Sequence, residues 1–345
     1  MPRPSQAGDV VSWSATLHGA LATALLAAGI FAGSRRLADF DGALIGYTFA
    51  CLFATFGIVY RYSAWLTKPP TRLLFRRGVG LLWRRPGVLL GAVSSRLITQ
   101  GFIWSRGRAR WLAHMLIAWG CALAAAVTFP LVFGWLHFEP GAPGTYRVVA
   151  FGLRLAELPL GSVAAWLVLR ALVISSFLVI PGVMLAMHRR LRDSGAIAVQ
   201  RFGRDLLPLL MLFAISATGL MLWASYEFLR GTWYAVLAQI HAFTVIATLI
   251  YLPFGKLFHI FQRPASLGVA AYRAEGARSA QAVCPETKRP FASEMQLTDL
   301  DAILPEVGFD YRSARGGPSW TRVSPAGKRK LLARAQSNAR SGKFD

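Results

Sequence analysis

The side chains best suited to metal or proton chemistry in this sequence are six histidines: His18, His114, His137, His188, His241 and His259. Three of them, His18, His114 and His241, fall inside long apolar runs, where an ionisable side chain is costly and usually serves a function. The other three lie at the ends of such runs, where a hydrated histidine needs no special explanation. For any one histidine, ordinary packing is the simpler interpretation, so the functional argument depends on how the set is arranged.

Two of these histidines bracket the last apolar run, HAFTVIATLIYLPFGKLFHIF, residues 241–261. His241 and His259 are 18 residues apart, which is five turns of a continuous α-helix. Both rings would then project from one face, about 27 Å apart along the axis. The hydrocarbon core of a bilayer is about 30 Å thick. We therefore expect one final helix over 235–260 with a histidine near each membrane surface.

A third histidine lies at the same depth as His259 on a different run. In RWLAHMLIAWG, His114 is one turn inside the third apolar run, near the membrane surface where the last run ends at His259. Two neutral imidazoles at one depth on different helices suit the two axial positions of a haem b iron. Arg110 and Lys256 lie at the level where haem propionates would seek a cation.

The composition indicates which elements must position these histidines. Mean hydropathy is +0.44, with 54% hydrophobic and only 16% charged residues, far from the balance of a soluble domain. Each apolar run is near the roughly 20 residues that cross a bilayer. The sequence predicts an all-α integral membrane protein with about six transmembrane helices, of which the last four form a haem-binding bundle. The six runs are 12–33, 43–66, 111–136, 162–187, 206–225 and 235–260.

The chain divides by composition into four parts: two N-terminal transmembrane helices, a basic interfacial segment, a cytochrome b-like membrane domain and a small basic cytoplasmic tail. In that order they are 1–66, 67–110, 111–261 and 262–345.

The basic residues predict the orientation of the chain. The connection 67–110 carries ten Lys and Arg and the connection 188–204 carries five, whereas 137–161 and 226–234 carry three between them. By the positive-inside rule the two rich connections and the tail are cytoplasmic. We expect a multi-pass protein of the cell inner (plasma) membrane with both termini in the cytoplasm.

The segment 67–110 alternates Leu, Phe and Trp with arginines, as interfacial helices on the cytoplasmic leaflet do. Contact with membrane lipid is the first interpretation, and docking of an acidic partner is the alternative. The net charge of +22 follows from this bias and the tail, so a nucleic-acid partner is not expected.

The cysteines imply no disulfide framework, since Cys51 and Cys121 lie inside apolar runs and Cys284 lies in the tail. CPETKRPFAS at 284–293 and SPAGKRKLLARAQ at 324–336 resemble two CPxC half-sites 40 residues apart. Of the four ligand positions only Cys284 is a cysteine; the other three are Thr287, Ser324 and Gly327. We therefore expect neither zinc nor an iron–sulfur cluster in this chain. The string SEMQ within FASEMQLTDLDAIL predicts a capping box and a short helix.

The stretch HAFTVIATLIYLPFGKLFHIFQRP resembles the last helix of the haem b membrane (gamma) subunit of respiratory nitrate reductase. WLAHMLIAWG resembles the ligand helix of the same fold, which also occurs in heterodisulfide-reductase-related membrane subunits. This likeness covers about 111–262. TFPLVFGWLHFEP and AVQRFGRDLLPLLMLFAISATGL resemble, more narrowly, the membrane domain of iron–sulfur electron-transfer proteins of the dimethylglycine-catabolism type. Those proteins pass electrons from flavoproteins to quinone, and we expect this chain to lack their iron–sulfur domains.

The resemblance implies that His114 and His259 are the inner haem ligands and that His241 is the outer ligand on the last helix. Its fourth ligand position holds Ala124 in this chain. One haem b is therefore expected, and a second remains open. Arg170 is placed near the depth of His241, and because an arginine cannot ligate iron, we expect the two to face a quinone or a haem propionate.

Two functions are compatible with these features. The first is an electron-transfer subunit of a membrane oxidoreductase complex, which relays electrons between a cytoplasmic iron–sulfur or flavoprotein partner and the quinone pool. The second is a non-redox membrane protein, a transporter or an assembly factor, descended from such a cytochrome. Transporters usually show internal repeats and broken helices at mid-membrane. The sequence shows no repeat, and its histidines lie near the membrane surfaces, which favours the cytochrome.

Overall fold

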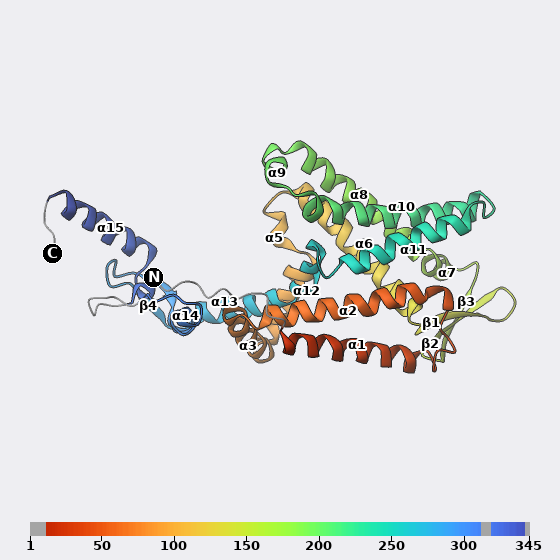
Figure 1. The fold of residues 1–345 in the computed structure, drawn as a ribbon, viewed down its shortest axis with the longest axis horizontal. Helices are drawn as coiled ribbons and strands as arrows, with labels where there is room; N and C mark the ends of the chain where they lie inside the picture. The colour runs from red at the N-terminus through yellow and green to blue at the C-terminus, as the bar shows by residue number, and fades with distance from the viewer. Residues whose placement is uncertain (1–11, 312–318, 342–345) are drawn as a thin grey trace. The chain divides into compact units, whose positions relative to one another are not determined.

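The computed structural model describes residues 12–311 and 319–341, which belong to two compact units. We call one the membrane unit; it comprises Ser12–Ser63 and Ile98–Gln262. We call the other the tail unit; it comprises Ala64–Leu97 and the described part of Arg263–Asp345. Figure 1 shows the elements of each.

Six helices are long and apolar enough to cross a membrane, as the sequence predicts. Their outward faces are apolar: Leu17, Leu21 and Leu25 are 67%, 55% and 64% exposed along one face of the first helix. A helix that presents leucines outward at a spacing of four residues is stable in lipid rather than in water. The six are α1 (Trp13–Gly33), α2 (Ile45–Leu66), α6 (Arg108–Val132), α8 (Ala171–Arg192), α10 (Leu207–Phe228) and α11 (Tyr234–Tyr251).

Helices α6 and α8 pack closely because small residues line their contact. A Cβ on Gly120 would lie 2.6 Å from Val179, and one on Gly182 would lie 2.9 Å from the carbonyl oxygen of Ala113. The Ser175 hydroxyl donates to the Gly120 carbonyl over 2.9 Å. Small residues and interhelical hydrogen bonds drive helix association in lipid, where burial of apolar surface gives little. Helix α8 also packs against α10, and α10 against α11.

Short helices connect these spans within the membrane unit. They are the 3₁₀-helix Gly42–Leu44, α5 (Gly101–Trp104), α7 (Val163–Leu169), α9 (Ser194–Val199), the π-helix Phe202–Leu206, the 3₁₀-helix Lys256–Phe258 and α12 (His259–Gln262). A second π-helix, Ser94–Ile98, leads into the membrane unit from the tail unit.

The final apolar run is not one helix, and the expectation of a continuous helix over 235–260 is wrong. Helix α11 ends at Tyr251, and a turn over 252–255 separates it from the 3₁₀-helix Lys256–Phe258. Pro253 has no amide hydrogen to continue the helical ladder. Gly255 is extended, and its backbone passes so close to the Tyr251 ring that a Cβ would lie 2.1 Å from it. His259 therefore does not share a helix face with His241.

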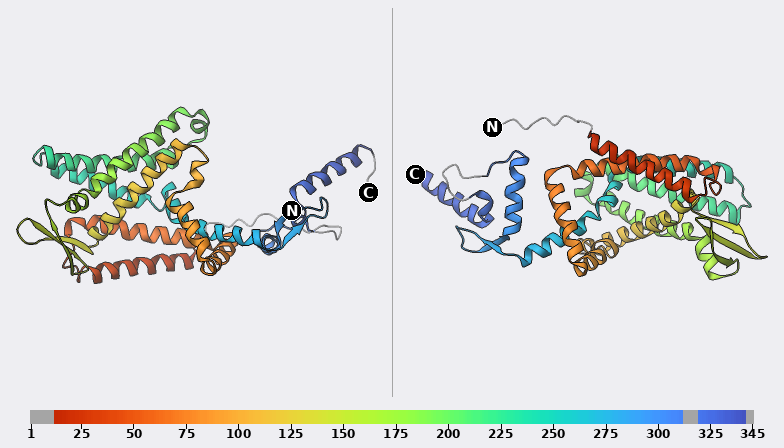
Figure 2. Two further views of the ribbon diagram at one scale, coloured as in Figure 1. Left: turned by 180° about the vertical axis from the view of Figure 1, so that it is seen from behind. Right: turned by 90° about the horizontal axis from the view of Figure 1, so that it is seen from below.

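A small sheet replaces the irregular connection expected over 137–161. Strands β1 (Leu136–Pro140), β2 (Thr145–Ala150) and β3 (Leu153–Pro159) form an antiparallel meander with β2 in the centre. His137 pairs with Val149, where the β2–β3 register shifts. The views of Figures 1 and 2 place this sheet at one end of the membrane unit. The fold is thus mostly helical, with a sheet that the sequence analysis did not predict.

The tail unit joins the first part of the basic segment to the tail. Helix α3 (Pro69–Arg84) crosses α13 (Ala265–Arg278) so closely that a Cβ on Gly78 would lie 2.6 Å from the Cα of Gly268. Ion pairs add to this packing: Arg72–Glu306 at 2.9 Å, Arg77–Asp299 at 2.8 Å and Arg85–Glu275 at 2.8 Å.

The other elements of the tail unit are α4 (Pro86–Val93), strands β4 (Gln281–Val283) and β5 (Pro290–Ser293), α14 (Glu294–Glu306), the 3₁₀-helix Trp320–Arg322 and α15 (Pro325–Arg340). Helix α14 begins with the predicted capping box, in which Ser293 and Gln296 bond each other's backbone amides.

Candidate functional site

The structure brings His114 and His259 together, although 145 positions separate them in the sequence. His114 lies in the second turn of α6 and His259 is the first residue of α12. Their ring centroids are 6.4 Å apart and their planes meet at 69°. Both side chains are half-buried. His259 thus approaches His114 from a short separate helix rather than from the end of a long one.

The backbone fixes which nitrogen of His259 carries the hydrogen. Its Nδ1 lies 2.6 Å from the carbonyl oxygen of Lys256, and a carbonyl can only accept. Nδ1 therefore donates, so in a neutral ring Nε2 is the nitrogen that carries no hydrogen. A metal-bound histidine typically donates its other ring nitrogen to such a carbonyl, and this contact sets its tautomer and orientation.

The distance between the two rings fits a metal ion bound by both. Metal–imidazole nitrogen bonds are about 2 Å long, so an iron between two Nε2 atoms places the ring centroids about 6 Å apart. The observed 6.4 Å agrees with that spacing. The donor set, two imidazoles, is one that b-type haem uses.

Arg61 on α2 holds the turn that leads to His259, a role that the sequence analysis missed. Its Nη1 donates to the carbonyl oxygen of Pro253, and its guanidinium carbon lies 4.3 Å from the centroid of the Phe258 ring. One turn earlier, Gly57 lets α2 approach so closely that a Cβ there would lie 2.7 Å from Pro253. A single arginine late in an apolar run is the signal that could have identified this residue.

His241 lies in α11 and contacts α10. Its Nδ1 is 2.9 Å from the Thr218 hydroxyl oxygen, and that hydroxyl donates to the Ala214 carbonyl over 2.7 Å. Because the hydroxyl hydrogen is used there, Nδ1 of His241 donates to Thr218 and Nε2 remains an acceptor. A Cβ on the neighbouring Gly219 would lie 3.5 Å from the His241 ring.

Arg170 does not join His241. It lies between α7 and α8, and its Nη2 donates to both carboxylate oxygens of Glu227, at 3.0 and 3.1 Å. Glu227 is nine residues beyond Thr218 on α10, about 13 Å along that helix. Arg170 and His241 are therefore held by partners at different levels of the same helix.

The two residues expected near haem propionates have different surroundings. Lys256 donates to Asp205 over 2.6 Å. Arg110 is exposed near the start of α6 and lies close enough to Arg189 for the two charges to repel each other.

The remaining histidines have other contacts. The Nδ1 of His18 is 2.7 Å from the Ser63 hydroxyl, and Nε2 of His137 is 3.4 Å from Glu139. His188 is exposed near the end of α8.

In the tail unit the four positions of the two half-sites meet around one fully buried thiol. The Ser324 amide donates to Sγ of Cys284 over 3.3 Å, and Thr287 also donates to that sulfur. A Cβ on Gly327 would lie 2.8 Å from the same sulfur. The Ser324 hydroxyl accepts from the Gly327 amide over 3.0 Å, as a cysteine sulfur does in a metal-binding turn. Burial raises the pKa of Cys284, but the hydrogen bonds from Ser324 and Thr287 outweigh it and lower the pKa to about 6.

Within residues 12–311 and 319–341, no three His, Cys, Asp or Glu side chains are grouped to hold a metal ion. No protein-family model, curated protein or solved structure matches this chain. The functional interpretation therefore depends on its own residues.

Proposed function

We propose that this chain is a membrane cytochrome of the b type, in which His114 and His259 are the axial ligands of one haem. The observation that carries the proposal is the 6.4 Å separation of their ring centroids, together with the contact that directs Nε2 of His259 away from the Lys256 carbonyl. Bound haem supplies reversible one-electron transfer.

The chain's own residues would set the orientation of this site. The Lys256 carbonyl holds the His259 ring, and Arg61 holds the turn before it through Pro253 and Phe258. Helix α8, packed through Gly182 against the backbone at Ala113, fixes the turn of α6 that carries His114. Contacts behind a metal ligand tune its orientation and basicity and affect metal affinity strongly.

His241 would contact the quinone at the other end of the electron-transfer path. Its Nε2 can accept the hydrogen bond, and then the proton, of a quinol hydroxyl, while Thr218 holds the ring from the other side. Because Arg170 is paired with Glu227, we do not propose that Arg170 and His241 bind one quinone together.

The partner that exchanges electrons with this chain would be an iron–sulfur or flavin protein on the cytoplasmic side, since the basic connections favour that orientation and an acidic partner. The resemblance of WLAHMLIAWG and the last run to the nitrate reductase gamma subunit supports the same role. A transporter or assembly factor is the competing function, and it requires no haem.

The absorption spectrum of the purified full-length protein, oxidised and then reduced with dithionite, separates the two functions. A sharp reduced alpha band of the b type supports the cytochrome. A protein that binds no haem, even when produced with excess haem, would instead favour the non-redox function.

A further inference from the structure

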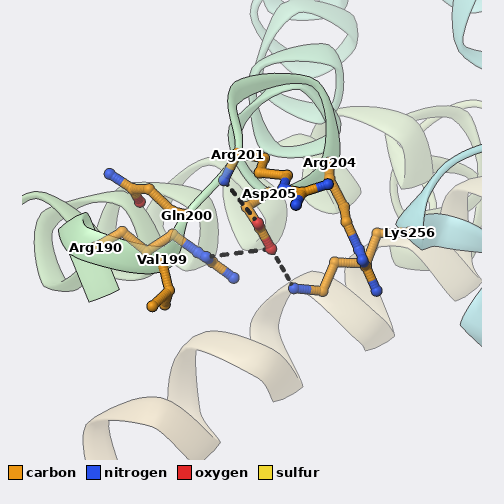
Figure 3. Close-up of a pocket in the computed structure, with 7 residues that line it drawn as sticks. All are labelled: Arg190, Val199, Gln200, Arg201, Arg204, Asp205 and Lys256. Atoms are coloured by element: carbon orange, nitrogen blue, oxygen red, sulfur yellow. Dashed lines mark hydrogen bonds and ion pairs between the residues drawn. The ribbon is translucent and has the colours of Figure 1, made fainter. Parts of the chain in front are cut away.

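A basic pocket of about 420 Å³ lies where the end of α8, the end of α9 with the π-helix after it, and the start of the 3₁₀-helix Lys256–Phe258 meet (Figure 3). Four of its lining side chains are cationic and one is a carboxylate. The lining residues are Arg190, Val199, Gln200, Arg201, Arg204, Asp205 and Lys256.

The single carboxylate is fully engaged. Oδ1 of Asp205 accepts from Lys256 over 2.6 Å and lies 3.8 Å from Arg190, while Oδ2 accepts from the Arg201 amide over 3.1 Å. Figure 3 shows Asp205 at the centre of these contacts, between the surrounding basic side chains. Asp205 thus holds the basic side chains in place, but its single negative charge does not cancel their four positive charges.

The guanidinium groups of Arg201 and Arg204 keep their charge available. In the part of the chain that the structure describes, neither forms an ion pair with a carboxylate, and both side chains are exposed. Two guanidinium groups beside a pocket that already holds an excess of positive charge favour a ligand with a phosphate group.

The surroundings of the pocket are apolar. Val199 lines it with 79% of its side chain exposed, and Phe202, which begins the π-helix before α10, is 62% exposed. The pocket lies at the ends of two membrane-spanning helices, α8 and α10. Exposed apolar side chains beside a cationic pocket at a helix end match the boundary between lipid headgroups and acyl chains.

We propose that this pocket binds the phosphate headgroup of an anionic phospholipid, with Arg201 and Arg204 as the main contacts and Val199 and Phe202 against the acyl chains. Lys256 lines this pocket and its carbonyl also holds His259, but the proposal does not rest on haem binding, because neither arginine belongs to the histidine pair. Phosphate is the chemistry recognised, and the apolar surroundings favour a lipid over the free ion.

The test measures lipid binding to the full-length protein, purified in a mild detergent and washed free of lipid. Calorimetric titrations use short-chain phosphatidylglycerol, phosphatidylcholine with the same chains, and inorganic phosphate. The matched variants are Arg201→Gln with Arg204→Gln, and the control Arg106→Gln with Arg192→Gln, which removes two exposed arginines outside the pocket.

We expect phosphatidylglycerol to bind more tightly than the other two ligands. The pocket double variant should weaken this binding about 30-fold, because the two arginines contribute similar amounts to the free energy of binding an anionic lipid. The control double variant should change it by less than about threefold. Thermal unfolding of both variants verifies that they fold.

Equal loss of binding in both double variants, or equal binding of phosphatidylcholine, would overturn the proposal in favour of unspecific lipid contact. Inorganic phosphate bound as tightly as phosphatidylglycerol would show a free-anion site instead. Loss of haem in the pocket variant with unchanged lipid binding would assign the arginines to haem propionates and would also contradict the proposal.

Discussion

The guanidinium carbon of Arg61 lies 4.3 Å from the centroid of the ring of Phe258, the residue that directly precedes His259 in the sequence. This contact links an N-terminal helix to the candidate ligand. The candidate site therefore includes a residue outside the last four spans, to which the sequence prediction confined it.

Replacing Arg61 with Ala should loosen the segment 253–258, which leads to His259, and lower haem retention. The lost contacts are a charged hydrogen bond to the Pro253 carbonyl and a cation–π contact with Phe258, together about 2–3 kcal/mol. The measurement is the haem-to-protein ratio after detergent washing, with Arg154→Ala on β3 as the control. Arg61→Lys should recover part of the loss; full haem retention in Arg61→Ala would show that α2 does not position the ligand.

Thr218→Val should impair quinol oxidation without removing the haem held by His114 and His259. The valine cannot accept from Nδ1 of His241, so the ring loses the contact that fixes its tautomer. Quinol oxidation by the reconstituted protein should fall at least about tenfold, a typical effect of losing a supporting contact of this kind. An unchanged rate would remove Thr218 from the proposed quinol site.

The haem content distinguishes a quinol-side role of His241 from a ligand role. We expect a pyridine haemochrome value near one haem per chain, and His241→Ala should keep it. A value near two that His241→Ala lowers by one haem would make His241 an iron ligand instead.

The tail unit should bind no metal. Three of the four half-site positions are occupied by Thr287, Ser324 and Gly327, which bond or contact the Cys284 thiol in place of a metal. Metal analysis of the full-length protein should find no stoichiometric zinc and no iron beyond that in haem. Zinc that is lost on changing Cys284→Ser would contradict this expectation.

The low pKa of Cys284 predicts a pH dependence of stability. The hydrogen bonds from Ser324 and Thr287 favour the thiolate, so the folded pKa, about 6, is below the usual 9.0. Their stabilising contribution is fully present above about pH 9 and is lost as the pH falls through about 6. The unfolding midpoint of the wild type, relative to Cys284→Ser, should therefore rise over this interval. A difference that does not vary with pH would contradict a stabilised thiolate.

The sequence predicted the six spans because apolar runs of bilayer length have one stable structure in lipid. It also predicted the capping box at Ser293 and Gln296, which depends only on local hydrogen bonds. His114 and His259 lie close together, although the premise of one long final helix is wrong. Helix α11 ends just before Pro253 and Gly255, and the 3₁₀-helix that follows them leads to His259.

Contacts between distant segments could not be predicted in this way. The approach of Gly78 to Gly268, and the ion pair of Arg77 with Asp299, depend on how two helices cross rather than on either sequence alone. The β1–β3 meander was missed because its residues fall between two spans and read as a loop. Arg61 was missed because its partners, Pro253 and Phe258, lie about 190 residues further along the chain, a separation across which a sequence pattern gives no register.

The most direct test of the central claim is the reduced-minus-oxidised spectrum of His114→Ala and His259→Ala, compared with His188→Ala, whose exposed side chain lies near the end of α8. If the two imidazoles whose centroids lie 6.4 Å apart are the axial ligands, each of the first two variants loses the low-spin alpha band and His188→Ala keeps it. A full-strength alpha band in folded His259→Ala protein would contradict the assignment.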